Sequence, residues 1–268
     1  MEEAGHRRFA LLAWWLALLG VVLAMASCRR RDRLPATPYP TAKLAYRVGN
    51  CVYMDLNHAG EPEKGICYGD RGEPMLAGDF DGNGTTDLAV RRQGLLLIDT
   101  AGDGQGHETA LDLGDVADAS GYLVADFSGT ADRRGRASVC VVRGDGCTVQ
   151  GPPGAPGAGH RLVPGDERFA GRWRKEGPAR LGARGGLCVD LDENGDERAD
   201  KHLCYEDLAI IHQVLVGDWN GDGRDDLVLR RGGCVFVDMR LDGTHTESQC
   251  LGEGRGATDY FVGSWDGK

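Results

Sequence analysis

The sequence contains none of the motifs on which several common enzyme classes depend. It has no H-E-x-x-H zinc motif, no G-x-S-x-G nucleophile motif and no phosphate-binding P-loop. It also lacks a C-x-x-C pair, the close ligand spacing of zinc–thiolate sites. The sequence therefore gives no positive sign of these enzymes or of a structural zinc site.

Hydrophobic residues are scarce, and glycines are abundant. The hydrophobic share of the 268 residues is 41%, and 42 residues are glycine. This composition suits a turn-rich all-β domain better than a helical one. One large domain accounts for the length.

Basic residues are outnumbered once the N-terminal segment is set aside. Residues 1–40 contain six arginines and three acids, so the remaining chain has 25 basic and 38 acidic residues and a net charge of −13. Nucleic acid is therefore not expected as a partner.

The long hydrophobic run FALLAWWLALLGVVLAMAS lies near the N-terminus, between an arginine pair and Cys28. We interpret residues 1–27 as a signal peptide. The small residues before Cys28 resemble the lipobox of bacterial lipoproteins, which predicts lipidation of Cys28. The Pro- and Arg-rich residues 28–40 then form an extended tether. The alternative is an uncleaved anchor helix, because about 19 apolar residues can span a bilayer.

A small-acid-aromatic signature recurs at nearly constant steps of 47, 46, 46 and 46 residues. Its aromatic residues are Phe80, Phe127, Trp173, Trp219 and Trp265. Residues 41–268 hold about five such units. We place the aromatic residue in the seam between units, with a ligand-stacking role as the alternative.

Each unit has the pattern of four short strands. In the best-preserved unit, QVLVGDW, DLVLRR, CVFVDM and SQCLG alternate with period two between Gly- and Asp-rich turns. This is typical of a propeller blade, so we predict an all-β, five-bladed β-propeller over residues 41–268. The final segment DYFVGSWDGK would pair with the first blade and close the ring. The Pro/Gly-rich residues 150–167 are expected to replace the outer strand of the third blade.

Eight cysteines follow Cys28, in four close pairs that flank glycine-containing turns. The pairs are Cys51 with Cys67, Cys140 with Cys147, Cys188 with Cys204, and Cys234 with Cys250. Opposed residues in an antiparallel hairpin lie about 4.5 to 5.5 Å apart, which a disulfide can bridge. We predict that each pair joins strands three and four of a blade, and that Leu96, Leu97 and Leu111 replace it in the second blade. Four disulfides require an oxidising compartment, which favours export.

Two acid-rich loops, DFDGNGTTD and DWNGDGRDD, place oxygen ligands at positions 1, 3, 5, 7 and 9. The ligands are Asp79, Asp81, Asn83, the Thr85 carbonyl and Asp87 in one loop, and Asp218, Asn220, Asp222, the Arg224 carbonyl and Asp226 in the other. Calcium takes six to eight oxygens, and the glycine at position 6 permits the sharp turn. We therefore predict one Ca²⁺ site in each loop.

A third copy, DENGDERAD, lies between Cys188 and Cys204. Its ligands would be Asp192, Asn194, Asp196, the Arg198 carbonyl and Asp200. Glu197 replaces the glycine, and a left-handed backbone there costs about 1 kcal/mol. For all three loops the alternative is an Asp/Asn/Gly turn without metal. The two remaining blade starts carry arginine in place of acids and are not expected to bind a cation.

The two loops resemble FG-GAP and VCBS-type repeats, which occur in integrin α subunits and bacterial surface proteins. The resemblance rests on the text G-D-[FW]-[DN]-G-[DN]-G-x-x-D-L in residues 76–92 and 215–231. It implies a β-propeller in which Asp-rich loops bind calcium between the first two strands of a blade. It also implies a role in adhesion, ligand binding or scaffolding.

The resulting hypothesis is a monomeric, non-catalytic, calcium-binding propeller, lipid-anchored in the bacterial cell envelope and facing either the periplasm or the surface. It would present a surface to a protein or glycan partner. The alternative is a glycosidase-like, carbohydrate-active enzyme with a carboxylate pair at the axis.

Overall fold

The computed structural model describes residues 41–129, 136–151, 159–251 and 256–267. The predicted signal peptide, Cys28 and the tether lie outside these ranges. Within the described part of the chain, no helix has the length and hydrophobicity needed to cross a membrane. The one helical element there is a short 3₁₀ turn, η1 (Glu206–Leu208).

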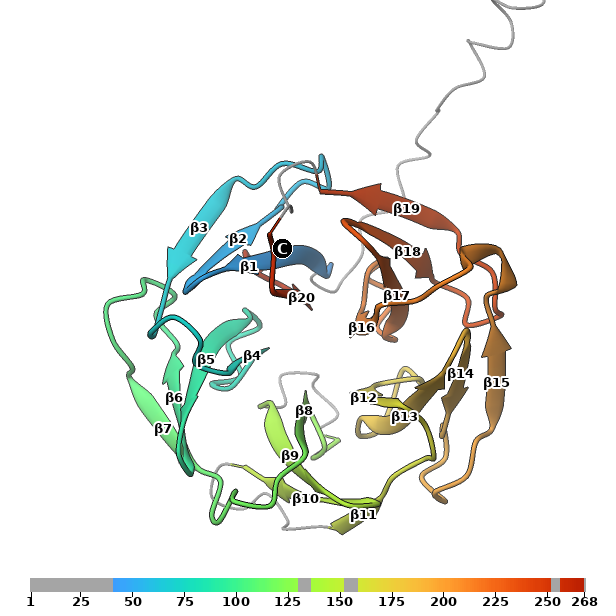
Figure 1. The fold of residues 1–268 in the computed structure, drawn as a ribbon, viewed down its shortest axis with the longest axis horizontal. Coiled ribbons are helices and arrows are strands. Elements are labelled where there is room, and N and C mark those ends of the chain that lie inside the picture. The colour runs from blue at the N-terminus through green and yellow to red at the C-terminus, as the bar shows by residue number, and fades with distance from the viewer. Residues whose placement is uncertain (1–40, 130–135, 152–158, 252–255, 268) are drawn as a thin grey trace, which may run out of the picture. The chain divides into compact units, whose positions relative to one another are not determined.

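The described residues form five antiparallel four-stranded sheets around a ring (Figure 1). From the innermost strand outwards, the first blade contains β20 (Asp259–Gly263), β1 (Lys43–Val48), β2 (Cys51–Met54) and β3 (Lys64–Cys67), and the second contains β4 (Met75–Gly78), β5 (Asp87–Arg92), β6 (Leu95–Asp99) and β7 (Thr109–Asp112). The third blade contains β8 (Gly121–Ala125), β9 (Ser138–Arg143), β10 (Gly146–Gln150) and β11 (Gly159–Arg161), and the fourth contains β12 (Glu167–Gly171), β13 (Arg180–Gly185), β14 (Cys188–Leu191) and β15 (Lys201–Cys204). The fifth blade contains β16 (Gln213–Gly217), β17 (Asp226–Arg231), β18 (Cys234–Asp238) and β19 (Glu247–Cys250). The predicted five-bladed propeller is confirmed.

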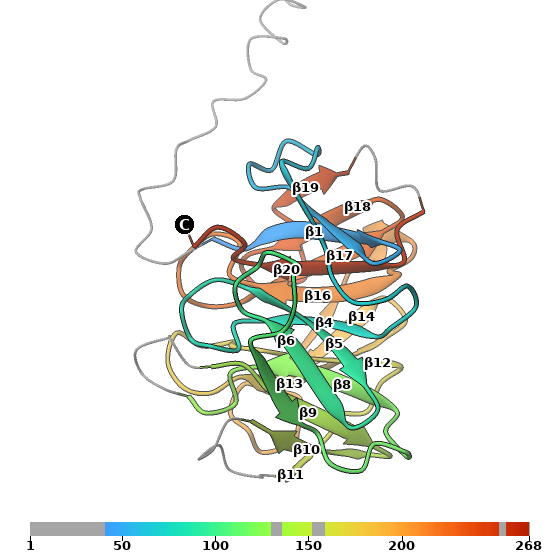
Figure 2. The ribbon, with the colours of Figure 1, turned by 90° about the vertical axis from the view of Figure 1, so that its left-hand side faces the viewer.

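The C-terminal strand closes the ring, as the repeat predicted. β20 pairs with β1 in the first blade, with Tyr260 opposite Tyr46 and Gly263 opposite Lys43. In the edge-on view of Figure 2, β20 and β16 run along the ring axis. Each blade therefore turns one edge of its innermost strand towards the axis, and each of the five sheets in the described residues has four strands.

One backbone hydrogen bond of 2.7 to 2.8 Å of the same kind connects each blade to the next, which makes five around the ring. In every case the amide just before the second strand of one blade donates to the carbonyl just before the signature aromatic residue of its neighbour. The pairs are Ala42 to Asp218, Thr86 to Ser264, Ala137 to Asp79, Ala179 to Asp126, and Asp225 to Arg172. The repeat thus encodes a continuous ring of inter-blade bonds.

The signature aromatic residues fill the seams, as predicted. Phe80 of the second blade packs with Val139 and Val141 of the third. Trp265 of the first blade packs with Leu88 of the second. These buried rings supply much of the apolar area that a single blade cannot bury alone.

A glycine two residues before four of these aromatic residues permits close approach of the blades. A Cβ atom at Gly217 would lie 2.6 Å from Val262 Cγ1 and 2.9 Å from Ala42 Cβ. Both distances are below van der Waals contact, so a side chain here would push the fifth blade away from the first.

All four predicted disulfides are present, and three of them join strands three and four of a blade. In those three, the cysteines face each other directly across the hairpin. Cys140–Cys147 differs, because it joins β9 and β10, the second and third strands of their blade. The prediction that every pair joins strands three and four was wrong here. A separation of only 7 residues spans the tight turn between β9 and β10 and cannot reach the outer strand.

Two smaller predictions also need correction. In the second blade, Leu95 and Asp112 occupy the place that the opposed cysteines hold elsewhere, one residue away from the predicted Leu96 and Leu111. In the third blade, the short strand β11 pairs with β10, so residues 150–167 do include an outer strand.

Candidate metal sites in the inner hairpin loops

The two predicted calcium loops connect the innermost strand to the second strand of a blade. One follows β4 and the other follows β16. Gly78 lies opposite Asp87, and Gly217 lies opposite Asp226. This register brings the carboxylates of positions 1 and 9 to the same end of the hairpin, because position 1 directly follows each glycine.

In the first loop, the carboxylates converge. Ligand oxygens of Asp79, Asp81 and Asp87 lie within 4.8 Å of one another. Asp79 accepts hydrogen bonds from the amides of Gly82 at 2.7 Å and Gly84 at 2.8 Å. These bonds fold the backbone around the carboxylates and hold them at one end of the hairpin.

In the second loop, a buried carboxylate oxygen is unsatisfied. Asp226 is fully buried, and its Oδ2 accepts a hydrogen bond of 2.8 Å from the Trp219 amide. Its Oδ1 has no hydrogen-bond partner. Asp218 accepts from the amides of Asp222 at 2.9 Å and Gly223 at 2.6 Å. An oxygen left unpaired beside other carboxylates suits a metal ligand, since an isolated buried anion is costly.

Burial and mutual repulsion raise the pKa values of these acids. Burial is the main cause, and neighbouring aspartates add to it. The pKa of Asp226 rises to about 8, that of Asp87 to about 7 and that of Asp218 to about 6. The pKa of Asp79 is also raised. The raised pKa values mean that the surroundings of these acids disfavour their charged forms.

The other blades supply a cation of their own at the same repeat positions. In the first blade, Lys43 stands where Asp87 and Asp226 stand, and its buried ammonium lies 2.6 Å from Asp266. In the fourth blade, Arg172 replaces the position-1 aspartate, and its guanidinium lies 3.0 Å from Asp126 of the third.

The two candidate loops lack such an internal cation. Asp79, Asp81 and Asp87, and likewise Asp218, Asp222 and Asp226, form no ion pair of 4.0 Å or less with a basic side chain of the described residues. This distinguishes the two loops from the corresponding inner loops that Lys43 and Arg172 compensate.

The third predicted loop is ordered by hydrogen bonds to its own aspartates. The Asp192 Oδ2 accepts from the Glu197 amide at 3.0 Å, and the Asp200 Oδ1 accepts from the Asn194 side-chain amide at 2.9 Å. The Asp200 Oδ2 accepts from the Glu193 amide at 2.7 Å. These carboxylate oxygens have donors within the loop, as the two oxygens of Asp79 do in the first loop. Glu197 adopts the predicted left-handed conformation, with φ of 68°.

An aspartate recurs in the outer hairpins, and it was recognised from the sequence only at Asp192. It stands at Asp55, Asp99, Asp192 and Asp238, and in each hairpin it accepts a hydrogen bond from the amide five residues later. The third loop belongs to this set of turns. In the second blade, Asp99, Asp103 and Glu108 also have oxygens within 4.8 Å of one another. The signal in the sequence was the recurrence of aspartate four residues after the start of the third strand.

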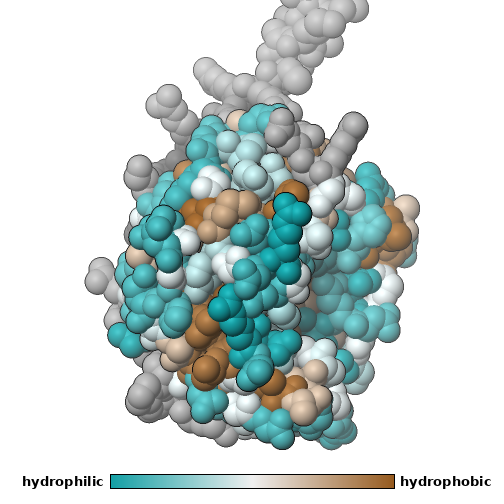
Figure 3. All heavy atoms as spheres, turned by 60° about the vertical axis from the view of Figure 1, so that its left-hand side comes forward, coloured by the Kyte–Doolittle hydropathy of each residue, from teal (hydrophilic) through white to brown (hydrophobic). Residues whose placement is uncertain are grey.

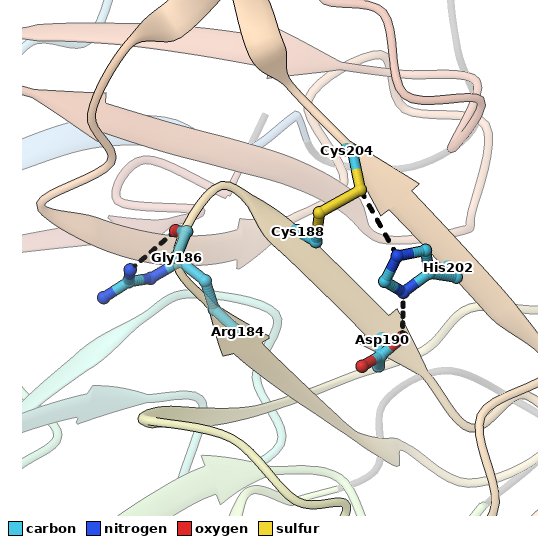
Figure 4. The surroundings of a disulfide bond; sticks show 6 residues. All are labelled: Arg184, Gly186, Cys188, Asp190, His202 and Cys204. Carbon is cyan, nitrogen blue, oxygen red and sulfur yellow. Dashed lines mark hydrogen bonds and ion pairs between the residues drawn. A yellow bond between two sulfur atoms is a disulfide. The ribbon is translucent and has the colours of Figure 1, made fainter.

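The fourth blade brings two cysteines and a histidine together (Figure 4). The His202 ring lies between Asp190, at 2.7 Å, and the sulfur of Cys204, at 3.3 Å. Because Cys204 is bonded to Cys188 in a disulfide, neither sulfur is the thiolate that a zinc site requires. His202 lies in β15, where its side chain is exposed and contacts Asp190.

A cavity of about 300 Å³ lies at the axis, lined by the innermost strands of all five blades. Its lining contains two charged residues, Arg168 and Asp259. A glycosidase of the usual type needs two carboxylic acids across the scissile bond. With Asp259 as its single carboxylate, this lining lacks the pair that the enzyme alternative requires.

No protein-family model matches the chain, and no curated protein matches it. Among solved structures, it is similar to one titled as the structural basis of specific recognition of non-reducing terminal N-acetylglucosamine by an Agrocybe aegerita lectin. The identity is 19% and the TM-score 0.40, and the match covers 72% of this chain. The chain spans 57% of the length of that structure. The resemblance to FG-GAP and VCBS-type repeats therefore rests on the two loop motifs alone.

Proposed function

We propose that the protein is a non-catalytic β-propeller that binds one Ca²⁺ ion in each of two inner hairpin loops and presents a rigid surface to a protein or glycan partner. The ligands are Asp79, Asp81, Asn83, Thr85 and Asp87 in the second blade, and Asp218, Asn220, Asp222, Arg224 and Asp226 in the fifth. Thr85 and Arg224 contribute backbone carbonyls.

The observation that carries this proposal is the uncompensated charge of the two loops. The first loop gathers three aspartates within 4.8 Å, and the aspartates of neither loop have a basic partner among the described residues, whereas Lys43 and Arg172 provide one in other blades. The buried Asp226 Oδ1 has no hydrogen-bond partner and is therefore available to coordinate a cation. Oxygen-only donors favour a hard cation such as calcium over zinc or copper.

Calcium would act on the seams between blades. The backbone carbonyls of Asp79 and Asp218 accept two of the five inter-blade hydrogen bonds. An ion held by the side chains of these residues fixes the same backbone. We therefore assign calcium a structural role in holding the second blade to the third, and the fifth to the first.

The four disulfides indicate an oxidising compartment. We propose that lipidated Cys28 and the tether hold the propeller at the bacterial cell envelope as a monomer. The surface is suited to polar partners. On the side shown in Figure 3, hydrophobic residues form small patches separated by hydrophilic side chains. Broad apolar docking would need a larger continuous patch.

Calcium titration by calorimetry tests the proposal. We expect two ions per chain in the parent protein. The isosteric variants Asp87→Asn and Asp226→Asn should each bind one ion, and the double variant none. Asp200→Asn, in the third loop, is the matched control and should leave the stoichiometry at two. Unchanged stoichiometry in both loop variants, or no calcium binding by the parent, would refute the proposal.

A further inference from the structure

One arginine in the axial cavity has no partner. Arg168, in β12, lines the cavity, and its Nε is buried without a hydrogen-bond partner. It forms no hydrogen bond or ion pair within the described residues. The Nε atom has lost water without gaining a hydrogen-bond acceptor, which costs free energy, whereas the residue as a whole is only half-buried.

The acids nearest to Arg168 in the sequence and in the lining are already engaged. Glu167 pairs with Arg184 at 2.7 Å. Asp259, the one carboxylate in the lining, pairs with Arg47 at 3.4 Å. The positive charge of Arg168 is therefore available to an outside ligand.

Arg168 also breaks the repeat. The same register position in the innermost strands of the other blades holds Met75, Tyr122, Val214 and Tyr260. Opposite Arg168 lies the small Ala183, where the other blades have Val90, Val141, Leu229 and Tyr46. A charged residue with a small neighbour, at a position that is otherwise apolar or aromatic, departs from what folding alone favours. Such departures are expected at functional sites.

The cavity lining also contains polar side chains, Gln213 and Tyr122, that a ligand of Arg168 could contact. Gln213 accepts a hydrogen bond from Arg230 at 3.2 Å through its oxygen, which leaves its amide group as a donor. Tyr122 contributes a hydroxyl group and a ring. A planar guanidinium pairs best with a carboxylate, through two parallel hydrogen bonds.

We propose that the axial cavity binds a ligand through one carboxylate group that pairs with Arg168. A volume of about 300 Å³ lies at the small end of ligand pockets and fits a molecule of monosaccharide size. The carboxylate belongs either to a free sugar acid or to the acidic end of a glycan. None of the proposed calcium ligands lines this cavity, so the two sites are independent.

The probes are free glucuronate and an oligosaccharide that ends in glucuronate, with glucose as the neutral control. Binding is followed by calorimetry in excess calcium. The test variant is Arg168→Met, because methionine stands at this position in the second blade. Arg161→Met, at an exposed arginine, is the control for net charge.

We expect at least one acidic probe to bind, glucose not to bind, and Arg168→Met to weaken binding tenfold or more while Arg161→Met does not. Tighter binding of the oligosaccharide identifies a glycan end as the ligand, and equal binding identifies the free acid. The unliganded Arg168→Met protein should melt at the same temperature as the parent or higher, because a buried Nε without a hydrogen-bond partner is removed. The proposal is overturned if neither acid binds, if binding survives in Arg168→Met, or if that variant is destabilised, which would make Arg168 a structural residue.

Discussion

Single residues at one repeat position decide how each inner loop balances its charge. The first residue of the second strand is Asp87 or Asp226 in the candidate calcium blades and Lys43 in the first blade. Where lysine stands, its ammonium contacts a loop carboxylate directly. Where aspartate stands, we propose that the loop takes a cation from solution.

The substitution Asp226→Lys should convert the fifth blade to the arrangement of the first. The lysine ammonium would compensate Asp218 and Asp222, so calcium binding at this loop should be lost without loss of the fold. We expect a calcium-free melting temperature no lower than that of the parent, and a smaller rise on adding calcium. Thermal melts in calcium and in chelator measure both quantities. A full calcium response in the variant would contradict the charge argument.

The raised pKa values give a second prediction. Between the ordinary pKa of aspartate, about 4, and the folded values of about 6 to 8, the calcium-free native protein holds protons that the unfolded chain has released. The contribution of these carboxyl groups to the free energy of unfolding therefore falls as pH rises through this window. Calcium replaces the protons, so its stabilising effect should be larger near pH 8 than near pH 5, and binding near pH 7 should release protons. Melts at both pH values, and calorimetry in buffers of different ionisation enthalpy, test this. An equal effect at both pH values would argue against these ligands.

At the scale of elements, the repeat made the blades predictable, because each four-stranded unit has its own alternation of apolar and polar residues and its own turn residues. The disulfide network was less predictable, because spacing identifies partners but not strands. Cys140 and Cys147 are close in sequence, and only the register shows that they bridge β9 and β10. The outer-hairpin aspartates other than Asp192 were missed because Asp55 and Asp238 have no full calcium pattern around them, although they order their turns in the same way.

The second blade offers a direct test of the hairpin register. Leu95 and Asp112 are opposed where other blades have a disulfide, and Leu95 is 45% exposed. The double variant Leu95→Cys/Asp112→Cys should form a fifth disulfide and stabilise the protein by about 3 kcal/mol, since it closes a loop of similar length. Leu95→Ser/Asp112→Ser is the matched control. Non-reducing peptide mapping and chemical denaturation give the two readouts. Free thiols at both positions would show that the register is wrong.

At the scale of the whole molecule, the ring depends on continuity between blades. Five inter-blade hydrogen bonds and the pairing of β20 with β1 join the chain ends into one closed structure. The steps of 46 to 47 residues predicted this closure because the final unit supplies one strand and the first unit supplies three. The axial position of Arg168 was not predictable, because only the closed ring brings five innermost strands around one cavity.

The central claim is that two inner loops, and not the outer hairpins, hold calcium. Anomalous diffraction from crystals grown with calcium locates bound ions directly. The account predicts two peaks, one between Asp79 and Asp87 and one between Asp218 and Asp226. An absence of peaks at both places, or peaks confined to the outer hairpins, would contradict it.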